Sequence, residues 1–377
     1  MMVKRCISAV VIIMCIINTC ASASPELNIN SKSAILMEQS TGQILFEQNP
    51  DEQLPIASVT KIMTLLLICE AIDEGKITID DNVTVSERAM SMGGSTMFLE
   101  TGDVISVDEM LKGIVVASAN DGAVAMAEYI GGSESEFVSQ MNERAKELGM
   151  KNTHFVNTNG LDADGHYSSA RDVAIMSREL MKHPLILNYT RIWTDTIRNG
   201  KFELANTNKL IRFYDGATGL KTGSTSKALC CLSATAERNG MGLVAVVLGA
   251  PDSNSRFNGA RTLLDWGFAA YSIKEIIPAN QEIGKMIIKG GTQKEVGLEI
   301  RNPETILIDK GDKSEFTYEI IESSDIKAPI YKGDCVGEGV IYKDKKEIKR
   351  TKLYANGDIP KKTFIFSAKE IIDILIS

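Results

Sequence analysis

The sequence has few of the residues on which disulfide-rich, zinc-binding and histidine-dependent proteins rely. Its 377 residues include seven cysteines and three histidines, and three of the cysteines lie near the N-terminus. The other four do not make a disulfide framework. Two of these, Cys230 and Cys231, are adjacent in a strand-like run and point to opposite faces, which favours buried packing over metal binding. No zinc-ligand spacing is present, so we expect neither a metal nor a cofactor.

Basic residues are outnumbered by acidic ones, with 41 Lys and Arg against 49 Asp and Glu. The formal net charge is -8, and it becomes -10 if Lys4 and Arg5 leave with an export signal. Binding to phosphate backbones requires clustered cations, so this balance argues against a nucleic-acid partner. The 44% apolar and 24% charged fractions are those of a folded globular protein, and the length predicts more than one domain.

The first 23 residues match an export signal better than a membrane span. Lys4 and Arg5 precede a largely apolar run that ends at Ile17, and the tripeptide Ala-Ser-Ala after Cys20 is a small-residue cleavage site. The run is shorter than the roughly 20 apolar residues that a spanning helix requires. Lipidation of Cys20 is an alternative that the preceding Asn-Thr fits poorly. We expect export to the outer face of the cytoplasmic membrane, the periplasm or the cell wall.

Residues 24–275 have the pattern of an α+β domain. Short strand-like runs occur at both its ends and helical patterns lie between them, which predicts a five-stranded antiparallel sheet with helices. The expected strands are 34–37, 43–47, 216–222, 228–236 and 242–249. The expected helices are 58–72 with one buried stripe, a capping-box helix from Ser106 to Val116, 121–130, 133–148, 169–181 and a last one through Trp266 and Tyr271.

Two further segments follow this domain. Residues 276–360 contain short β-branched runs separated by turn signals such as Gly-Gly and Asn-Pro, which predicts a small all-β domain. Residues 361–377 place Phe364, Ile372 and Leu375 on one helical face. This segment is too short to span a bilayer. We interpret it as an amphipathic helix on the membrane surface, with a helix docked on its own protein as the alternative.

Ser58 and Lys61 are three residues apart, at or near the start of the predicted helix 58–72. On a helix this spacing brings both side chains to one face, within about 5–6 Å. A serine hydroxyl is a weak nucleophile until a base removes its proton, and lysine is such a base only where burial or a second cation destabilises its ammonium form. The pattern alone is weak because exposed helices carry it by chance.

Two further motifs strengthen the prediction. Ser118-Ala119-Asn120 lies in a short connection between helices, where side chains project outward. Lys221-Thr222-Gly223 ends the first strand of the late sheet. Lys221 offers a second cation that disfavours the charged form of Lys61 and attracts a carboxylate. Gly223 lets a substrate backbone approach the strand.

With these three motifs in this order, the chain resembles the serine penicillin-recognising enzymes. The strings Pro55 to Thr64 (PIASVTKIMT) and Gly160 to Tyr167 (GLDADGHY) are similar to those of the low-molecular-mass D-alanyl-D-alanine carboxypeptidases. The resemblance covers essentially the whole mature chain. It implies a penicillin-binding, β-lactamase-like fold, an enzyme that trims the terminal D-alanine from peptidoglycan stem peptides, and β-lactam antibiotics as inhibitors.

The resemblance also implies a role for each motif residue. Ser58 is the nucleophile, Lys61 the general base, Ser118 a proton-relaying hydroxyl, and Asn120 a contact for the substrate amide. Lys221 and Thr222 hold the terminal carboxylate beside Gly223, and the backbone amides of Ser58 and Ser224 form the oxyanion hole. Arg256, in Arg256-Phe257-Asn258, assists Lys221 by analogy or forms an ordinary surface ion pair.

Three other functions remain open at this point. A β-lactamase shares all three motifs, but the Glu-x-x-Leu-Asn string of the class A form is absent. A non-catalytic module that binds wall peptides could retain the same fold. A histidine triad is disfavoured, because no Gly-x-Ser-x-Gly elbow precedes a histidine that could serve it. We interpret His154, His166 and His183 as structural or exposed.

Overall fold

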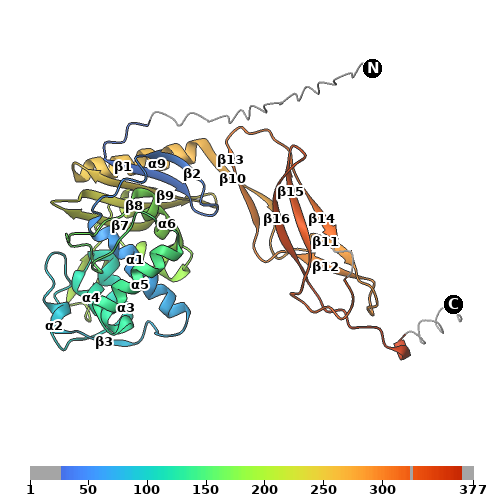
Figure 1. Ribbon diagram of the computed structural model, residues 1–377, viewed down its shortest axis with the longest axis horizontal. Helices are drawn as coiled ribbons and strands as arrows, with labels where there is room; N and C mark the ends of the chain where they lie inside the picture. Colours follow the sequence, from blue (N-terminus) through green and yellow to red (C-terminus); the bar gives the residue numbers. More distant parts are fainter. Residues whose placement is uncertain (1–26, 323–325, 367–377) are drawn as a thin grey trace, which may run out of the picture.

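The computed structural model describes residues 27–322 and 326–366 (Figure 1). The predicted signal peptide, with Cys20, and positions 367–377 of the predicted C-terminal helix lie outside the described residues. Among the residues described, no helix is long and apolar enough to cross a membrane.

A five-stranded antiparallel sheet organises the first part of the chain, with strand order β2-β1-β9-β8-β7. The predicted α+β fold is confirmed. Strand β1 (Ser33–Glu38) is buried at every position because both faces of the sheet are covered. Ile35 and Met37 join one hydrophobic cluster, whereas Ala34 and Leu36 join the other. The remaining strands are β2 (Ile44–Gln48), β7 (Ala217–Thr225), β8 (Leu229–Arg238) and β9 (Met241–Ala250).

Helices cover both faces of this sheet (Figure 1). Helix α9 (Ser253–Ala270) packs on one face, against β8 and β9. Helix α6 (Ala170–Leu180) packs on the other, against β9 and β1, and contacts helix α1 (Lys61–Asp73). The prediction that the last helix extends through Tyr271 was wrong by one residue, because Tyr271 is already the first residue of strand β10.

Helix α1 (Lys61–Asp73) is the central helix, and a 3-10 turn, η1 (Ala57–Thr60), leads into it. Ser58 therefore belongs to the turn before the helix. Nine of the thirteen residues of α1 are buried, so the expected single apolar stripe was too narrow. The reason is that α1 contacts α4, α5 and α6 as well as the strand β7.

Ser106 caps helix α3 (Val107–Lys112), as the capping box predicted, and its Oγ accepts a hydrogen bond from the Glu109 backbone N–H. The second half of the box is not formed, because the Glu109 carboxylate accepts from the backbone N–H of Arg198 instead. A short π-helix, η2 (Gly113–Ala117), then leads through Ser118 into helix α4 (Asn120–Gly131). Helix α5 (Glu134–Glu147) follows.

Short elements complete this part of the chain. They are β3 (Asn82–Thr84), α2 (Glu87–Met90), β4 (Val104–Ser106), η3 (Pro184–Ile186), α7 (Leu187–Thr190), β5 (Thr194–Ile197), β6 (Phe202–Ala205) and α8 (Leu210–Phe213).

The second part of the chain is built from strands, which confirms the predicted all-β region. Its five-stranded sheet has the order β11-β12-β16-β15-β14 and encloses a separate hydrophobic cluster. Strand β10 (Tyr271–Ile277) pairs with β13 (Glu304–Asp309), so the predicted boundary near residue 275 falls inside a paired strand and stays a prediction. The sheet strands are β11 (Gly284–Ile287), β12 (Glu295–Glu299), β14 (Phe316–Glu322), β15 (Cys335–Lys343) and β16 (Lys346–Ala355).

Candidate active site

Ser58 meets strand β7 through a close approach of two backbones. A Cβ built on Gly223 would lie 2.7 Å from the Ile56 carbonyl oxygen and 2.9 Å from the Ser58 backbone nitrogen. Only glycine fits so close a contact, so Gly223 is what allows β7 to lie against the turn that carries Ser58. Ser58 is half-buried and the neighbouring Ser224 is exposed, which leaves the hydroxyl of Ser58 within reach of solvent.

Lys61 is fully buried and reaches back to Ser58. Its Nζ lies 2.9 Å from Ser58 Oγ, 2.6 Å from Asn120 Oδ1 and 2.8 Å from the Asn159 carbonyl oxygen. A neutral amine has two N–H donors and one lone pair. The amide and carbonyl oxygens are pure acceptors, so they engage the two donors and leave the lone pair for the proton of Ser58.

Burial holds the pKa of Lys61 well below its ordinary value. The positive charge of Lys221 lowers it further, whereas the negative charge of Asp121 opposes the shift. All three hydrogen-bond partners of Lys61 are neutral, so none of them stabilises an ammonium ion as a carboxylate would. Lys61 is therefore suited to accept a proton at ordinary pH.

Lys221 shares this environment. It is 1% exposed, and its Nζ donates to the Thr222 carbonyl oxygen over 3.1 Å. Burial and the positive charge of Arg256 lower the pKa of Lys221 to about 7. A carboxylate placed beside Lys221 would stabilise its charged form, which suits the predicted capture of a terminal carboxylate.

The loop that carries Ser118 and Asn120 faces Lys61 from the other side. Ser118 is 4% exposed and adopts the left-handed conformation (φ 64°, ψ 34°) at the end of the π-helix. Asn120 is engaged at both ends of its amide, since Oδ1 accepts from Lys61 and Nδ2 donates to the Gly93 carbonyl oxygen over 2.6 Å. In this structure Asn120 thus orients the base, a role that the sequence did not assign to it.

Strand β7 presents the last predicted residues. Thr222 donates through Oγ1 to Thr207 Oγ1 over 2.7 Å. Arg256 donates through Nη1 to the Gly223 carbonyl oxygen over 3.0 Å, so it supports the backbone of β7. The alternative of an ordinary surface ion pair for Arg256 was wrong, because its hydrogen bonds go to backbone carbonyls and a serine hydroxyl. The nine predicted residues lie on η1, α1, the turn at Ser118, the start of α4, β7 and α9. Hydrogen bonds join Lys61 to Ser58 and Asn120, and strand β7 lies against the turn that carries Ser58.

Sequence reasoning missed two contributors to this site. The Asn159 carbonyl is a backbone group, which residue type does not reveal. The buried Asp121 accepts hydrogen bonds from the backbone N–H groups of Met97 and Leu99. It therefore holds the segment that contains these two residues against the start of α4. The position of Asp121 directly after the Ser118-Ala119-Asn120 motif was the feature of the sequence that could have identified it.

His166 is structural, as expected. Its Nδ1 accepts from the Val156 backbone N–H over 3.0 Å, so the ring proton is on Nε2 and points to Thr60 Oγ1 at 2.7 Å. Burial lowers the pKa of His166 to about 4, which keeps the ring neutral.

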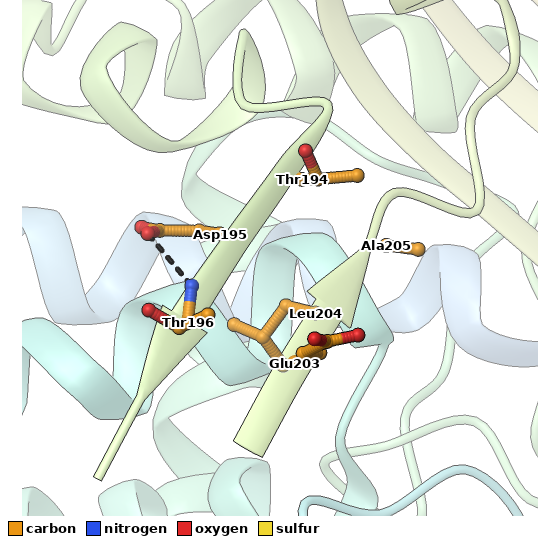
Figure 2. Close-up of a pocket in the computed structure, with 6 residues that line it drawn as sticks. All are labelled: Thr194, Asp195, Thr196, Glu203, Leu204 and Ala205. Atoms are coloured by element: carbon orange, nitrogen blue, oxygen red, sulfur yellow. Dashed lines mark hydrogen bonds between the residues drawn. The ribbon is translucent and has the colours of Figure 1, made fainter. Parts of the chain in front are cut away.

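A shallow depression lies elsewhere, on the hairpin formed by β5 and β6 (Figure 2). Its lining contains none of the predicted site residues. Asp195 accepts a hydrogen bond there from the backbone N–H of Thr196. It is lined by Thr194, Asp195, Thr196, Glu203, Leu204 and Ala205.

A serine beside a buried lysine with neutral partners, opposite a Ser-x-Asn loop and a Lys-Thr-Gly strand, defines a serine hydrolase of the penicillin-recognising class. The comparisons with known proteins narrow this class. A family model described as D-alanyl-D-alanine carboxypeptidase matches residues 18–252, and the C-terminal domain of penicillin-binding protein 5 matches residues 271–361. The chain belongs to the D-alanyl-D-alanine carboxypeptidase family.

Individual relatives agree with this assignment. The chain is 46% identical to D-alanyl-D-alanine carboxypeptidase DacF of Bacillus subtilis, over 90% of this chain and 88% of the relative. It is 34% identical to DacC of Escherichia coli, over 82% and 79%. Penicillin binding protein 5 from Haemophilus influenzae superposes with a TM-score of 0.73 at 33% identity, covering 89% and 99%. Penicillin-binding protein D2 from Listeria monocytogenes, in the ampicillin-bound form, superposes with a TM-score of 0.59 at 33% identity, covering 65% and 100%.

Proposed function

We propose that this protein removes the terminal D-alanine from peptidoglycan stem peptides that end in D-Ala-D-Ala, through an ester on Ser58. The observation that carries the proposal is the Lys61 amine, buried among neutral partners and 2.9 Å from Ser58 Oγ. That arrangement provides a base of lowered pKa next to a nucleophile that is weak without one.

The proposed reaction proceeds in two halves. Lys61 takes the proton of Ser58 while Oγ attacks the carbonyl carbon between the two D-alanines. The backbone amides of Ser58 and Ser224 receive the negative oxygen, and each such donor is worth about 2.7–4 kcal/mol. Ser118 relays the proton to the leaving amine, the C–N bond breaks, and D-alanine departs. Water then hydrolyses the ester and returns a proton to Ser58.

In the proposed reaction, strand β7 binds the free carboxylate at the end of the substrate. Lys221 supplies the positive charge and Thr222 a hydroxyl donor, while Arg256 holds the Gly223 carbonyl behind them. A penicillin carries a carboxylate near its reactive amide, so it would acylate Ser58 in the same way and remain bound. The ampicillin-bound relative supports this part of the proposal.

The proposed function is tested by incubating the purified mature protein with a pentapeptide that ends in D-Ala-D-Ala, and separately with penicillin. We expect release of one D-alanine per peptide and a stable penicillin ester without turnover. Rapid steady-state hydrolysis of penicillin would identify a β-lactamase. Binding of the peptide without release of D-alanine would identify a non-catalytic module.

Capture of the substrate carboxylate is expected to depend on pH through Lys221. Because the pKa of Lys221 is about 7 in the free protein, Lys221 is charged below this pH and loses its proton above it. We therefore expect KM for a free-acid peptide to increase above about pH 7, and Lys221→Ala to increase it most below that pH. The same peptide with an amidated C-terminus is the control. Equal turnover of both peptides by the wild type would contradict the role of Lys221.

We also infer that the protein works outside the cytoplasm, because a cell-wall peptide is its proposed substrate. Phe364 and Ile365 are 88% and 79% exposed at the start of the predicted C-terminal helix, which supports an apolar face for membrane contact. Deletion of residues 364–377 should release the mature protein from sedimenting membranes without loss of activity on a soluble peptide. A full-length mature protein that never sediments with membranes would rule out this attachment.

A further inference from the structure

The proposed reaction needs two segments at a fixed separation. The loop at 157–162 supplies the Asn159 carbonyl that orients Lys61. Strand β7 supplies the Ser224 amide and the carboxylate contacts. These segments are remote in the sequence, so contacts between them must fix the distance that separates them.

The loop is rigid in itself. Asn157 Oδ1 accepts from the backbone N–H groups of Asn159 and Gly160, and its Nδ2 donates to the Leu161 carbonyl oxygen. Gly160 has φ +86°, and a Cβ there would lie 1.9 Å from the Ala57 carbonyl oxygen. The loop therefore moves as a unit, and any contact that shifts it also shifts the acceptor of Lys61.

One side-chain hydrogen bond joins this loop to β7. Thr225 Oγ1 donates to Asp162 Oδ1 over 2.8 Å. The Ala228 backbone N–H donates to the same Oγ1 over 3.0 Å, which fixes the hydroxyl so that its proton points to the carboxylate. The nearby ion pair between Lys227 and Asp164 spans 3.8 Å between exposed side chains, so it contributes little.

We infer that the hydrogen bond between Thr225 and Asp162 is a positioning contact for acylation, which ties the acceptor of Lys61 to the strand that holds the substrate. This inference rests on the proposed function. Asp162 is exposed and Thr225 half-buried, so the bond adds little to the core, and its effect falls on the geometry of the site. A displacement of about 1 Å between reacting groups can lower a rate by up to about 100-fold.

The test is a double-mutant cycle on the second-order rate of acylation by fluorescent penicillin. Thr225→Val and Asp162→Ala should each lower this rate about tenfold, and the double variant should lose about tenfold as well, since both changes remove one contact. Thr225→Ser and Asp162→Asn keep the donor and the acceptor, so both should stay within about threefold of the wild type.

Thr78→Val is the matched control, because Thr78 Oγ1 donates to Asp81 Oδ1 over the same 2.8 Å in an exposed turn. It should leave the rate unchanged. Unchanged rates in the two single variants, or losses that multiply in the double variant, would overturn the positioning role alone. A wild type that penicillin does not label would overturn the proposed function and this inference with it.

Discussion

Replacement of Ser58 by alanine is expected to abolish covalent labelling by fluorescent penicillin. The hydroxyl oxygen of Ser58 is the atom that forms the proposed ester, and it lies 2.9 Å from the Nζ of the proposed base Lys61. The side chain is only half-buried and its hydrogen bond goes to Lys61, so its loss should leave the fold intact.

Labelling is measured by gel fluorescence after denaturation, and thermal unfolding is measured beside it. Ser91→Ala is the matched control, because Ser91 is an exposed serine whose hydroxyl donates to the Arg88 carbonyl oxygen. Labelling of the Ser58 variant at the wild-type level would remove Ser58 from its proposed role.

The second large effect is expected at Lys61. Methionine has a similar length and no charge, so Lys61→Met should fold well in a fully buried position. It removes the proposed base, however, and leaves Asn120 Oδ1 and the Asn159 carbonyl without their donor. Loss of a general base lowers a rate by about 10²–10⁴-fold.

The rate of penicillin acylation as a function of pH measures this effect. Below about pH 7, where Lys221 keeps its charge, the wild-type rate should increase with pH as Lys61 loses its proton, and the residual rate of the variant should lack that increase. Lys112→Met, at a lysine that pairs with Asp108 on the surface, serves as the control. A Lys61→Met protein that retains more than a tenth of the wild-type rate would argue for another base.

The sequence predicted most of the fold because its signals were local. The five strands of the first sheet, the cap at Ser106 and the helices predicted at 133–148 and 169–181 depend on short patterns, and the structure has each of them. The burial of most of α1 was missed, since a helix that contacts three others and a strand has only a narrow polar face to mark its orientation.

The predicted site residues also came from local motifs, but the contacts among them could not. The Asn159 carbonyl and the Gly223 carbonyl are main-chain groups, and every residue type supplies such a carbonyl equally. Their roles toward Lys61 and Arg256 appear only when the loop and the strand are placed in space. The hydrogen bond between Thr225 and Asp162 is hidden for the same reason.

The buried amine of Lys221 makes the stability of the folded protein depend on pH. The pKa of Lys221 is about 7 in the folded protein, against an ordinary value of 10.5. Between these values the unfolded chain binds the extra proton, so the free energy of unfolding rises as the solution becomes alkaline. We expect the midpoint temperature of thermal unfolding to increase as the pH is raised above 7. The contribution of Lys221 to stability is therefore greatest at the pH values at which Lys221 is neutral and no longer attracts a carboxylate.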